Sequence, residues 1–166
     1  MASKSFTAGI IAAVAGRFLL VRALLWKLGR DVEKLNAGDH APLLAAYGDD
    51  FVLHFHDGEH RWAGEWSGRP GMDRFLRNFV AAHVQGEIRS LAISGPPWAM
   101  TLWVRFDDHA DAPDGSRIYE NRTTLVLRTR WGKVVEQHDF YADTAPILAL
   151  ERKLTELGIA PIPKAG

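Results

Sequence analysis

Residues 117–141 read RIYENRTTLVLRTRWGKVVEQHDFY, and this stretch decides the fold class. Strand-forming residues predominate on both sides of Trp131-Gly132, so we predict strands at residues 117–129 and 133–141 with a tight turn between them. Successive side chains of a strand point to opposite faces, and either face of the first strand can line a pocket. The two alternative sets are Tyr119, Asn121 and Thr123, and Glu120, Arg122 and Thr124.

The rest of the chain adds further strands and several helices to this hairpin. Strands are predicted at residues 51–56, 61–66, 86–94 and 98–107. Helices are predicted at residues 18–35, 39–47, 71–84 and 145–157. Helices that come before a run of antiparallel strands are typical of an α+β fold, in which a curved sheet forms a pocket with the helices.

Length and composition limit the class of protein. The 166 residues suffice for one domain with an ordinary core, and 47% hydrophobic residues exclude general disorder. Cysteine is absent, which excludes disulfides, thiolate metal sites and a cysteine nucleophile. Twenty basic residues balance twenty acidic ones, so the chain lacks the net positive charge typical of nucleic-acid-binding proteins.

The charge is unevenly distributed along the chain. Residues 1–30 contain five basic residues and no acidic residue, whereas residues 31–166 contain fifteen basic and twenty acidic residues. We divide the chain into an apolar basic extension at residues 1–20, a domain at residues 21–158 and a loose tail at residues 159–166. The longest uncharged stretch of this extension is shorter than the apolar stretch that a membrane-spanning helix needs. It has some features of a signal peptide, but we expect an uncleaved, cytoplasmic protein.

Two alternatives remain for what the N-terminal helix contacts. As a basic amphipathic helix, it would lie in a membrane interface, with its cations near anionic headgroups. As a lid or dimer arm, it would bury the same apolar residues against protein. On a helical wheel Arg22, Lys27 and Arg30 share one sector while Arg17 lies opposite, which favours protein contact over peripheral membrane association.

Three segments resemble the SnoaL-like group of the nuclear transport factor 2-like superfamily. They are DDFVLHF at residues 49–55, which follows a helix, Gly38-Asp39 and a second helix, AGEWSG at residues 63–68, and WGKVVEQHDFYAD at residues 131–143. The resemblance covers residues 24–145 and implies a cone-shaped, curved sheet, antiparallel or mixed, with helices on its concave face, as in the cystatin-like α+β roll. It does not imply one activity, because this scaffold supports isomerases, cyclases, hydrolases and non-catalytic proteins.

Three enzyme families on this scaffold allow a residue-by-residue comparison. Ketosteroid isomerases carry a proton-transferring aspartate at the position that matches Phe55, and a phenyl ring cannot abstract a proton. Limonene-epoxide hydrolases use an Arg-x-Asp and a later Asp, which match Arg105, Asp107 and Asp139. The resemblance implies these three as catalytic residues, one carboxyl donating a proton and the other accepting one. Polyketide cyclases use a single aspartate base, which here would be Asp107 or Asp139.

Apolar and aromatic side chains are the expected substrate-binding residues. They are Leu53, Phe55, Trp103 and Tyr141. No cofactor and no metal are expected. His54-x-His56 has the spacing of metal ligands on a strand, but the sequence does not supply the remaining ligands of such a site.

These patterns predict a small-molecule pocket protein. Its expected function is that of a cofactor-independent enzyme which acts on an apolar metabolite by carboxylate acid/base chemistry, in epoxide opening or polyketide cyclisation. The alternative is a non-catalytic ligand-binding or assembly domain. Surplus apolar residues at 98–106 and 125–127 predict a homodimer through the outer face of the sheet, and no nucleic-acid partner is expected.

Overall fold

The computed structural model describes the backbone of residues 2–164 and the side chains of residues 15–164. The helices of this part are α1 (Ala2–Asn36), α2 (Ala41–Leu44), α3 (Gly68–Ala81) and α4 (Ala145–Glu156). Its strands are β1 (Tyr47–His54), β2 (Glu65–Ser67), β3 (Gln85–Ser94), β4 (Thr101–Asp111), β5 (Arg117–Arg130) and β6 (Lys133–Tyr141). The predicted elements are therefore present, although β1 begins earlier and β2 is shorter than the sequence indicated.

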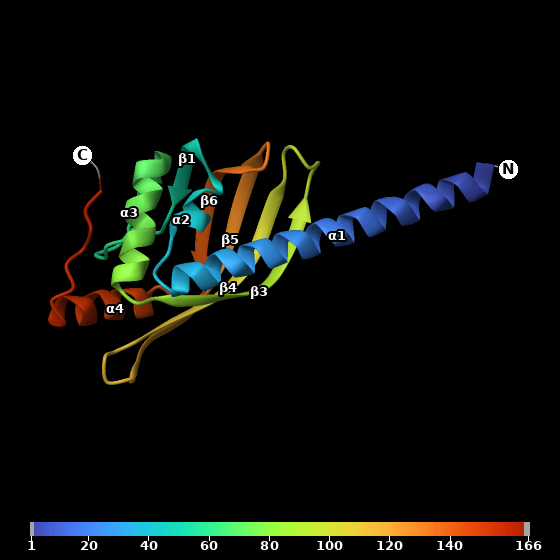
Figure 1. Cartoon of the computed structure of the whole chain (residues 1–166). Coiled ribbons are helices and arrows are strands. Elements are labelled where there is room, and N and C mark those ends of the chain that lie inside the picture. The colour runs from blue at the N-terminus through green and yellow to red at the C-terminus, as the bar shows by residue number, and fades with distance from the viewer. Residues whose placement is uncertain (1, 165–166) are drawn as a thin grey trace.

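The strands form one mixed sheet in the order β2-β1-β6-β5-β4-β3. Strands β1 and β6 run parallel, and every other pair is antiparallel. Helices α1, α2 and α3 lie over one face of the curved sheet, and α4 lies near one end (Figure 1). This arrangement confirms the α+β class and the curved sheet that the resemblance implied.

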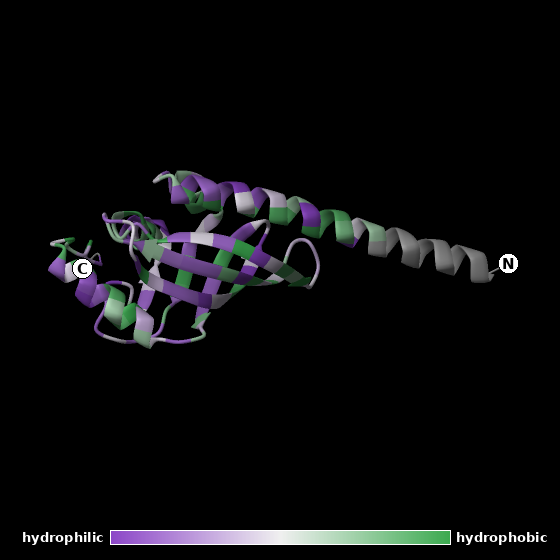
Figure 2. Cartoon of the chain, turned by 90° about the horizontal axis from the view of Figure 1, so that it is seen from below, coloured by the Kyte–Doolittle hydropathy of each residue, from purple (hydrophilic) through white to green (hydrophobic). Residues whose placement is uncertain are grey.

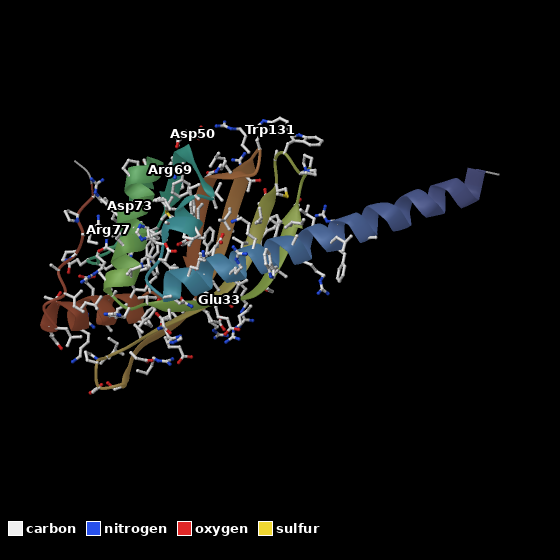
Figure 3. All side chains as sticks on the ribbon, viewed as in Figure 1. Glu33, Asp50, Arg69, Asp73, Arg77 and Trp131 are labelled. Carbon is white, nitrogen blue, oxygen red and sulfur yellow. The ribbon has the colours of Figure 1, made fainter. Side chains whose placement is uncertain are left out.

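The turn between β5 and β6 has the predicted position. It consists of Trp131 and Gly132, whose φ angles of 50° and 78° are both positive. Two positive φ angles in a two-residue hairpin define the turn type that matches the twist of antiparallel strands. Figure 3 shows Trp131 at the tip of this hairpin, where its side chain is exposed.

Strand alternation separates a buried inner face of the sheet from an outer face. Figure 2 shows hydrophobic and hydrophilic residues alternating along the strands. The inner face packs against α3 and α4 in one core that removes large side chains from water. Its most deeply buried members include Phe51, Leu53, Met72, Phe75, Ile147 and Leu150.

Helix α1 is longer than predicted. It runs unbroken from Ala2 to Asn36, so the proposed boundary between an extension and a domain at residue 20 falls inside one helix. No proline interrupts this segment, and the terminal part extends beyond the sheet (Figure 1). Within the described residues, none of the helices combines the length and apolarity needed to cross a membrane.

The C-terminal tail was predicted to be loose, and within residues 159–164 Ile162 and Lys164 make specific contacts with the domain. The buried Asn78 side chain donates to the carbonyl oxygen of Ile162 at 3.0 Å and accepts from its backbone N–H at 2.9 Å. Lys164 donates to the carbonyl oxygen of Glu65 and lies over the ring of Trp66. Side-chain amides that pair with backbone in this way hold a segment without regular secondary structure.

Candidate active site

A cavity of about 110 Å³ lies between the inner face of the sheet and helices α1 and α3. Its wall is almost entirely apolar. Residues Leu28, Val32 and Leu35 of α1 line one side, and Phe75, Leu76 and Phe79 of α3 line another. A largely apolar wall with a few polar groups is typical of a site for small apolar ligands.

The polar groups of the cavity are concentrated on β6. Gln137, Asp139 and Tyr141 occupy alternate positions of this strand, so their side chains share the inner face. The Tyr47 hydroxyl donates to Oε1 of Gln137 at 2.8 Å, and Nε2 of Gln137 donates to Oδ1 of Asp139 at 2.7 Å. This chain of two hydrogen bonds orients the Asp139 carboxyl, while its Oδ2 receives no hydrogen bond from the described residues.

Asp139 is a carboxyl group that changes charge near neutral pH. Burial disfavours its ionised form and raises its pKa from 3.8 to about 7. The hydrogen bond from Gln137 lowers the pKa, and the negative charge of Asp108 raises it, but burial is the largest cause. A carboxyl with such a pKa can accept or donate a proton at physiological pH.

Asp108 is a second buried carboxyl, behind the wall of the cavity. Its Oδ2 accepts hydrogen bonds from the hydroxyls of Tyr119 at 3.0 Å and Tyr141 at 3.4 Å. Burial raises the pKa of Asp108 to about 7, although both phenol hydrogen bonds oppose the rise. Because the Tyr141 ring lines the cavity and its hydroxyl reaches Asp108, this tyrosine connects the second carboxyl to the site.

Thr123 adds a hydroxyl that is available to a ligand. Its side chain is buried and lines the cavity, and Oγ1 has no hydrogen-bond partner among the described residues. Thr123 pairs with Tyr141 across β5 and β6, two residues along each strand from the Leu125 and Asp139 pair. An unpartnered buried hydroxyl costs free energy, and a polar group of a ligand would satisfy it.

The structure does not bring together the three residues implied as catalytic. Of these, Asp139 lines the cavity, whereas Arg105 and Asp107 lie on the outer face of β4. There Asp107 accepts a hydrogen bond from Arg89 at 2.9 Å and lies 3.7 Å from the Arg105 guanidinium. The residues of β4 that point inward are Leu102, Val104, Phe106, Asp108 and Ala110. The match to Arg-x-Asp was therefore one residue out of phase with the strand, and a shift of one residue exchanges the two faces.

The expected substrate-binding residues also divide between different places. Tyr141 lines the cavity, but Trp103 is on the outer face and 40% exposed. Leu53 and Phe55 point inward, yet neither lines the cavity. Leu53 is wholly buried in the core, and Phe55 packs against the rings of Phe75 and Tyr141.

Sequence reasoning missed Tyr47, Asp108 and Gln137 as site residues. Tyr47 was assigned to the end of a helix, whereas the strand that carries it starts there. Gln137 had a detectable signal, because it lies two residues before Asp139 on the same strand face. Of the two alternative faces of β5, the set with Tyr119, Asn121 and Thr123 is the inner one.

Histidines form a separate group on the outer face, away from the cavity. Among the described residues, His54, Glu136 and His138 have metal-ligating atoms within 4.8 Å of one another. The two histidine rings stack with centroids 4.4 Å apart, and Glu136 is already paired with Arg128 at 2.9 Å. The lone pair of an imidazole nitrogen lies in the plane of its ring, and the planes of two stacked rings are nearly parallel. The rings would therefore have to rotate before both could bind one ion.

Comparison with known proteins adds relatives of the same fold. A 20% identical protein of unknown function from Burkholderia pseudomallei superposes with a TM-score of 0.59 over 76% of this chain and 95% of its own. AclR from Streptomyces galilaeus is 22% identical, with a TM-score of 0.56 over 86% of this chain and 98% of its own. A nuclear transport factor 2-like protein from Anabaena variabilis is 18% identical, with a TM-score of 0.52 over 73% of this chain and 89% of its own.

These structural likenesses show the fold alone, since each sequence identity is low. A search of the curated proteins found no significant match. A family model of the SnoaL-like domain matches residues 30–137, which is more than half of the chain. The curved sheet (Figure 1) is consistent with this match, and the chain belongs to the family of SnoaL-like domains.

Proposed function

We propose that the protein is a cofactor-independent enzyme that binds an apolar carbonyl compound and moves a proton with Asp139. The observation that carries this proposal is a buried carboxyl with a pKa of about 7 on the wall of an otherwise apolar cavity. Between the two reactions expected from the sequence, cyclisation of a polyketide-type substrate fits better than epoxide opening. Epoxide opening relied on Arg105 and Asp107, which lie on the opposite face of the sheet.

The proposed reaction begins at a carbon next to a carbonyl group. Oδ2 of ionised Asp139 takes a proton from this carbon, and the electrons of the C–H bond form an enolate. The Thr123 hydroxyl donates a hydrogen bond to the enolate oxygen. The enolate carbon then attacks a second carbonyl carbon of the same molecule, and the resulting alkoxide takes the proton back from Asp139. Tyr47 and Gln137 are positioning residues, because they act through the Asp139 carboxyl.

Deuterium exchange tests the proton transfer without knowledge of the natural substrate. Apolar β-keto esters with one alkyl group on the acidic carbon would be incubated with the protein in D₂O, and incorporation would be followed by mass spectrometry. Asp139→Asn is expected to reduce the catalysed exchange by about 10²-fold or more, because asparagine cannot accept the proton. In the wild type, exchange should increase with pH and level off above about 7, where Asp139 is ionised.

Asp107→Asn is the matched control for this experiment. It makes the same chemical change on the outer face of the sheet, and exchange is expected to remain within about twofold of the wild-type rate. Ester binding, followed by tryptophan fluorescence, should persist in both variants. Equal exchange in the wild type and Asp139→Asn would contradict the proposal and leave a non-catalytic ligand-binding protein.

We also propose that two copies of the chain associate through the outer face of the sheet. Trp103, Val126 and His138 are directly opposite one another on β4, β5 and β6, and Phe140 beside them is 59% exposed. A row of exposed aromatic residues is typical of protein interfaces.

Sedimentation at tens of micromolar protein measures this association. We expect the mass of two chains for the wild type and of one chain for Trp103→Glu, because the new carboxylate would be buried without a partner. Leu157→Glu changes another exposed apolar residue, on the last turn after α4, and should leave the dimer intact. A wild-type mass of one chain would be incompatible with this interface.

A further inference from the structure

Helix α1 has two different sides where it passes the sheet. Leu20, Leu24 and Leu35 pack against the core, whereas Phe18 is 60% and Trp26 is 66% exposed. Each of these two aromatic residues is followed, one helical turn later, by an arginine. The Arg22 guanidinium lies 5.8 Å from the Phe18 ring centroid, and that of Arg30 lies 4.8 Å from the Trp26 centroid. The side of α1 that faces away from the sheet is thus both aromatic and cationic.

The structure also explains the one basic residue that did not fit an amphipathic pattern. Arg17 is on the side of α1 toward the sheet, where its guanidinium donates to the backbone carbonyl oxygen of Ile93. Lys27 pairs with the buried Asp31. The guanidinium groups of Arg22 and Arg30 have no acidic partner among the residues whose side chains are described, and they remain exposed.

We propose that this outward side of α1 binds the surface of an anionic lipid bilayer, with the helix axis parallel to the membrane. Aromatic rings insert at the level of the headgroups, while arginines extend to the phosphates with their aliphatic stems along the apolar boundary. Phe18, Leu19 and Trp26 supply the apolar residues of such a contact, and Arg22 and Arg30 supply the cations.

The charge distribution identifies an anionic surface as the occupant. Residues 1–30 have five basic and no acidic residues, so the same helices of two copies would repel each other if they packed together. An anionic bilayer attracts this segment and repels the rest of the chain, which has a net negative charge, and thereby orients the protein with α1 toward the lipid.

This placement brings the cavity close to the membrane. Leu28, Val32 and Leu35 line the cavity from the opposite side of the same helix. A hydrophobic ligand dissolved in the bilayer would therefore have a short path to the cavity. The membrane contact itself does not depend on the proposed chemistry of Asp139.

Flotation of the full chain with vesicles tests the proposal. Vesicles of phosphatidylcholine with about 30% phosphatidylglycerol are expected to bind at least about tenfold more protein than vesicles of phosphatidylcholine alone. The binding should weaken as salt concentration rises, because salt screens the attraction. Arg22→Glu/Arg30→Glu is expected to reduce binding to the anionic vesicles by about tenfold or more.

Arg152→Glu/Lys153→Glu is the matched control, since it reverses two exposed cations on α4, outside both α1 and the proposed dimer interface. Its binding should stay within about twofold of wild type. Circular dichroism would verify that both double variants are folded. Failure of the wild type to float with anionic vesicles would overturn the proposal. Equal losses in both double variants would also overturn it, because they would show an effect of net charge alone.

Discussion

Replacement of Asp139 by asparagine is expected to stabilise the protein at pH 8 by about 4 kcal/mol and to change its stability little near pH 4. The pKa of Asp139 is about 7 in the folded protein, compared with 3.8 for an ordinary aspartate. Between these values, the folded state holds a proton that the unfolded state has released. The stability that the neutral carboxyl contributes is therefore lost as the pH rises from about 4 to about 7.

Asparagine avoids this loss because it is neutral at every pH. Its Oδ1 can still accept the hydrogen bond from Gln137, so the local network is retained. A protein that keeps a charged group in an apolar cavity for its function is expected to be less stable than an inactive variant without that charge. Gain of stability together with loss of exchange activity would identify Asp139 as a group retained for chemistry.

Urea unfolding at pH 4, 6 and 8 measures the effect. Burial lowers the pKa of His60 to about 4, which by itself makes the protein less stable as the pH falls below 6.5. This contribution is common to wild type and variant, and it cancels in their difference. Asp107→Asn should show no such pH-dependent difference. Parallel curves for wild type and Asp139→Asn would disprove the raised pKa.

Replacement of Leu53 by alanine is expected to destabilise the protein by about 3–4 kcal/mol. The Leu53 side chain is fully buried on β1, the strand between β2 and β6, and it does not line the cavity. Truncation therefore leaves a void in a close-packed region, and neighbouring side chains can fill only part of it. This cost distinguishes a core residue from the substrate-binding residue that the sequence suggested.

Leu28→Ala is the matched control, since it makes the same change at a half-buried residue that lines the cavity. Truncation there enlarges an existing space, so a smaller loss of about 1 kcal/mol is expected. Equilibrium unfolding in urea, with the slope compared among the variants, gives both values. If Leu53→Ala cost no more than Leu28→Ala, the assignment of Leu53 to the core would be wrong.

The helices and strands were predictable because each depends on a pattern of residues that are close together in the sequence. Alternation in residues 117–141 and the turn at Trp131-Gly132 define the β5–β6 hairpin locally. The same local rule placed Asp139 and Tyr141 on one face of β6. The start of β1 at Tyr47 was missed, because the preceding helix and this strand meet without a clear breaker.

The catalytic set inferred on β4 shows where a local pattern is insufficient. Arg105 and Asp107 have the residue types of a known motif, and only the phase of the strand reveals that they point outward. That phase is set by Leu102, Val104 and Phe106, which pack toward the helices. Asp108 is inward for the same reason, and its environment depends on Tyr119 and Tyr141 from two other strands.

The sequence by itself determined the α+β class, the resemblance to SnoaL-like domains, the basic character of α1 and the presence of Asp139 on the last strand. Only the tertiary structure decided that Tyr47, from the start of β1, reaches Gln137 and thereby orients Asp139. It also decided which face of α1 is free, since Arg17 is turned toward Ile93. The physical reason is that strand and helix patterns are local, whereas burial, pKa and exposure arise from side chains that are far apart in the chain.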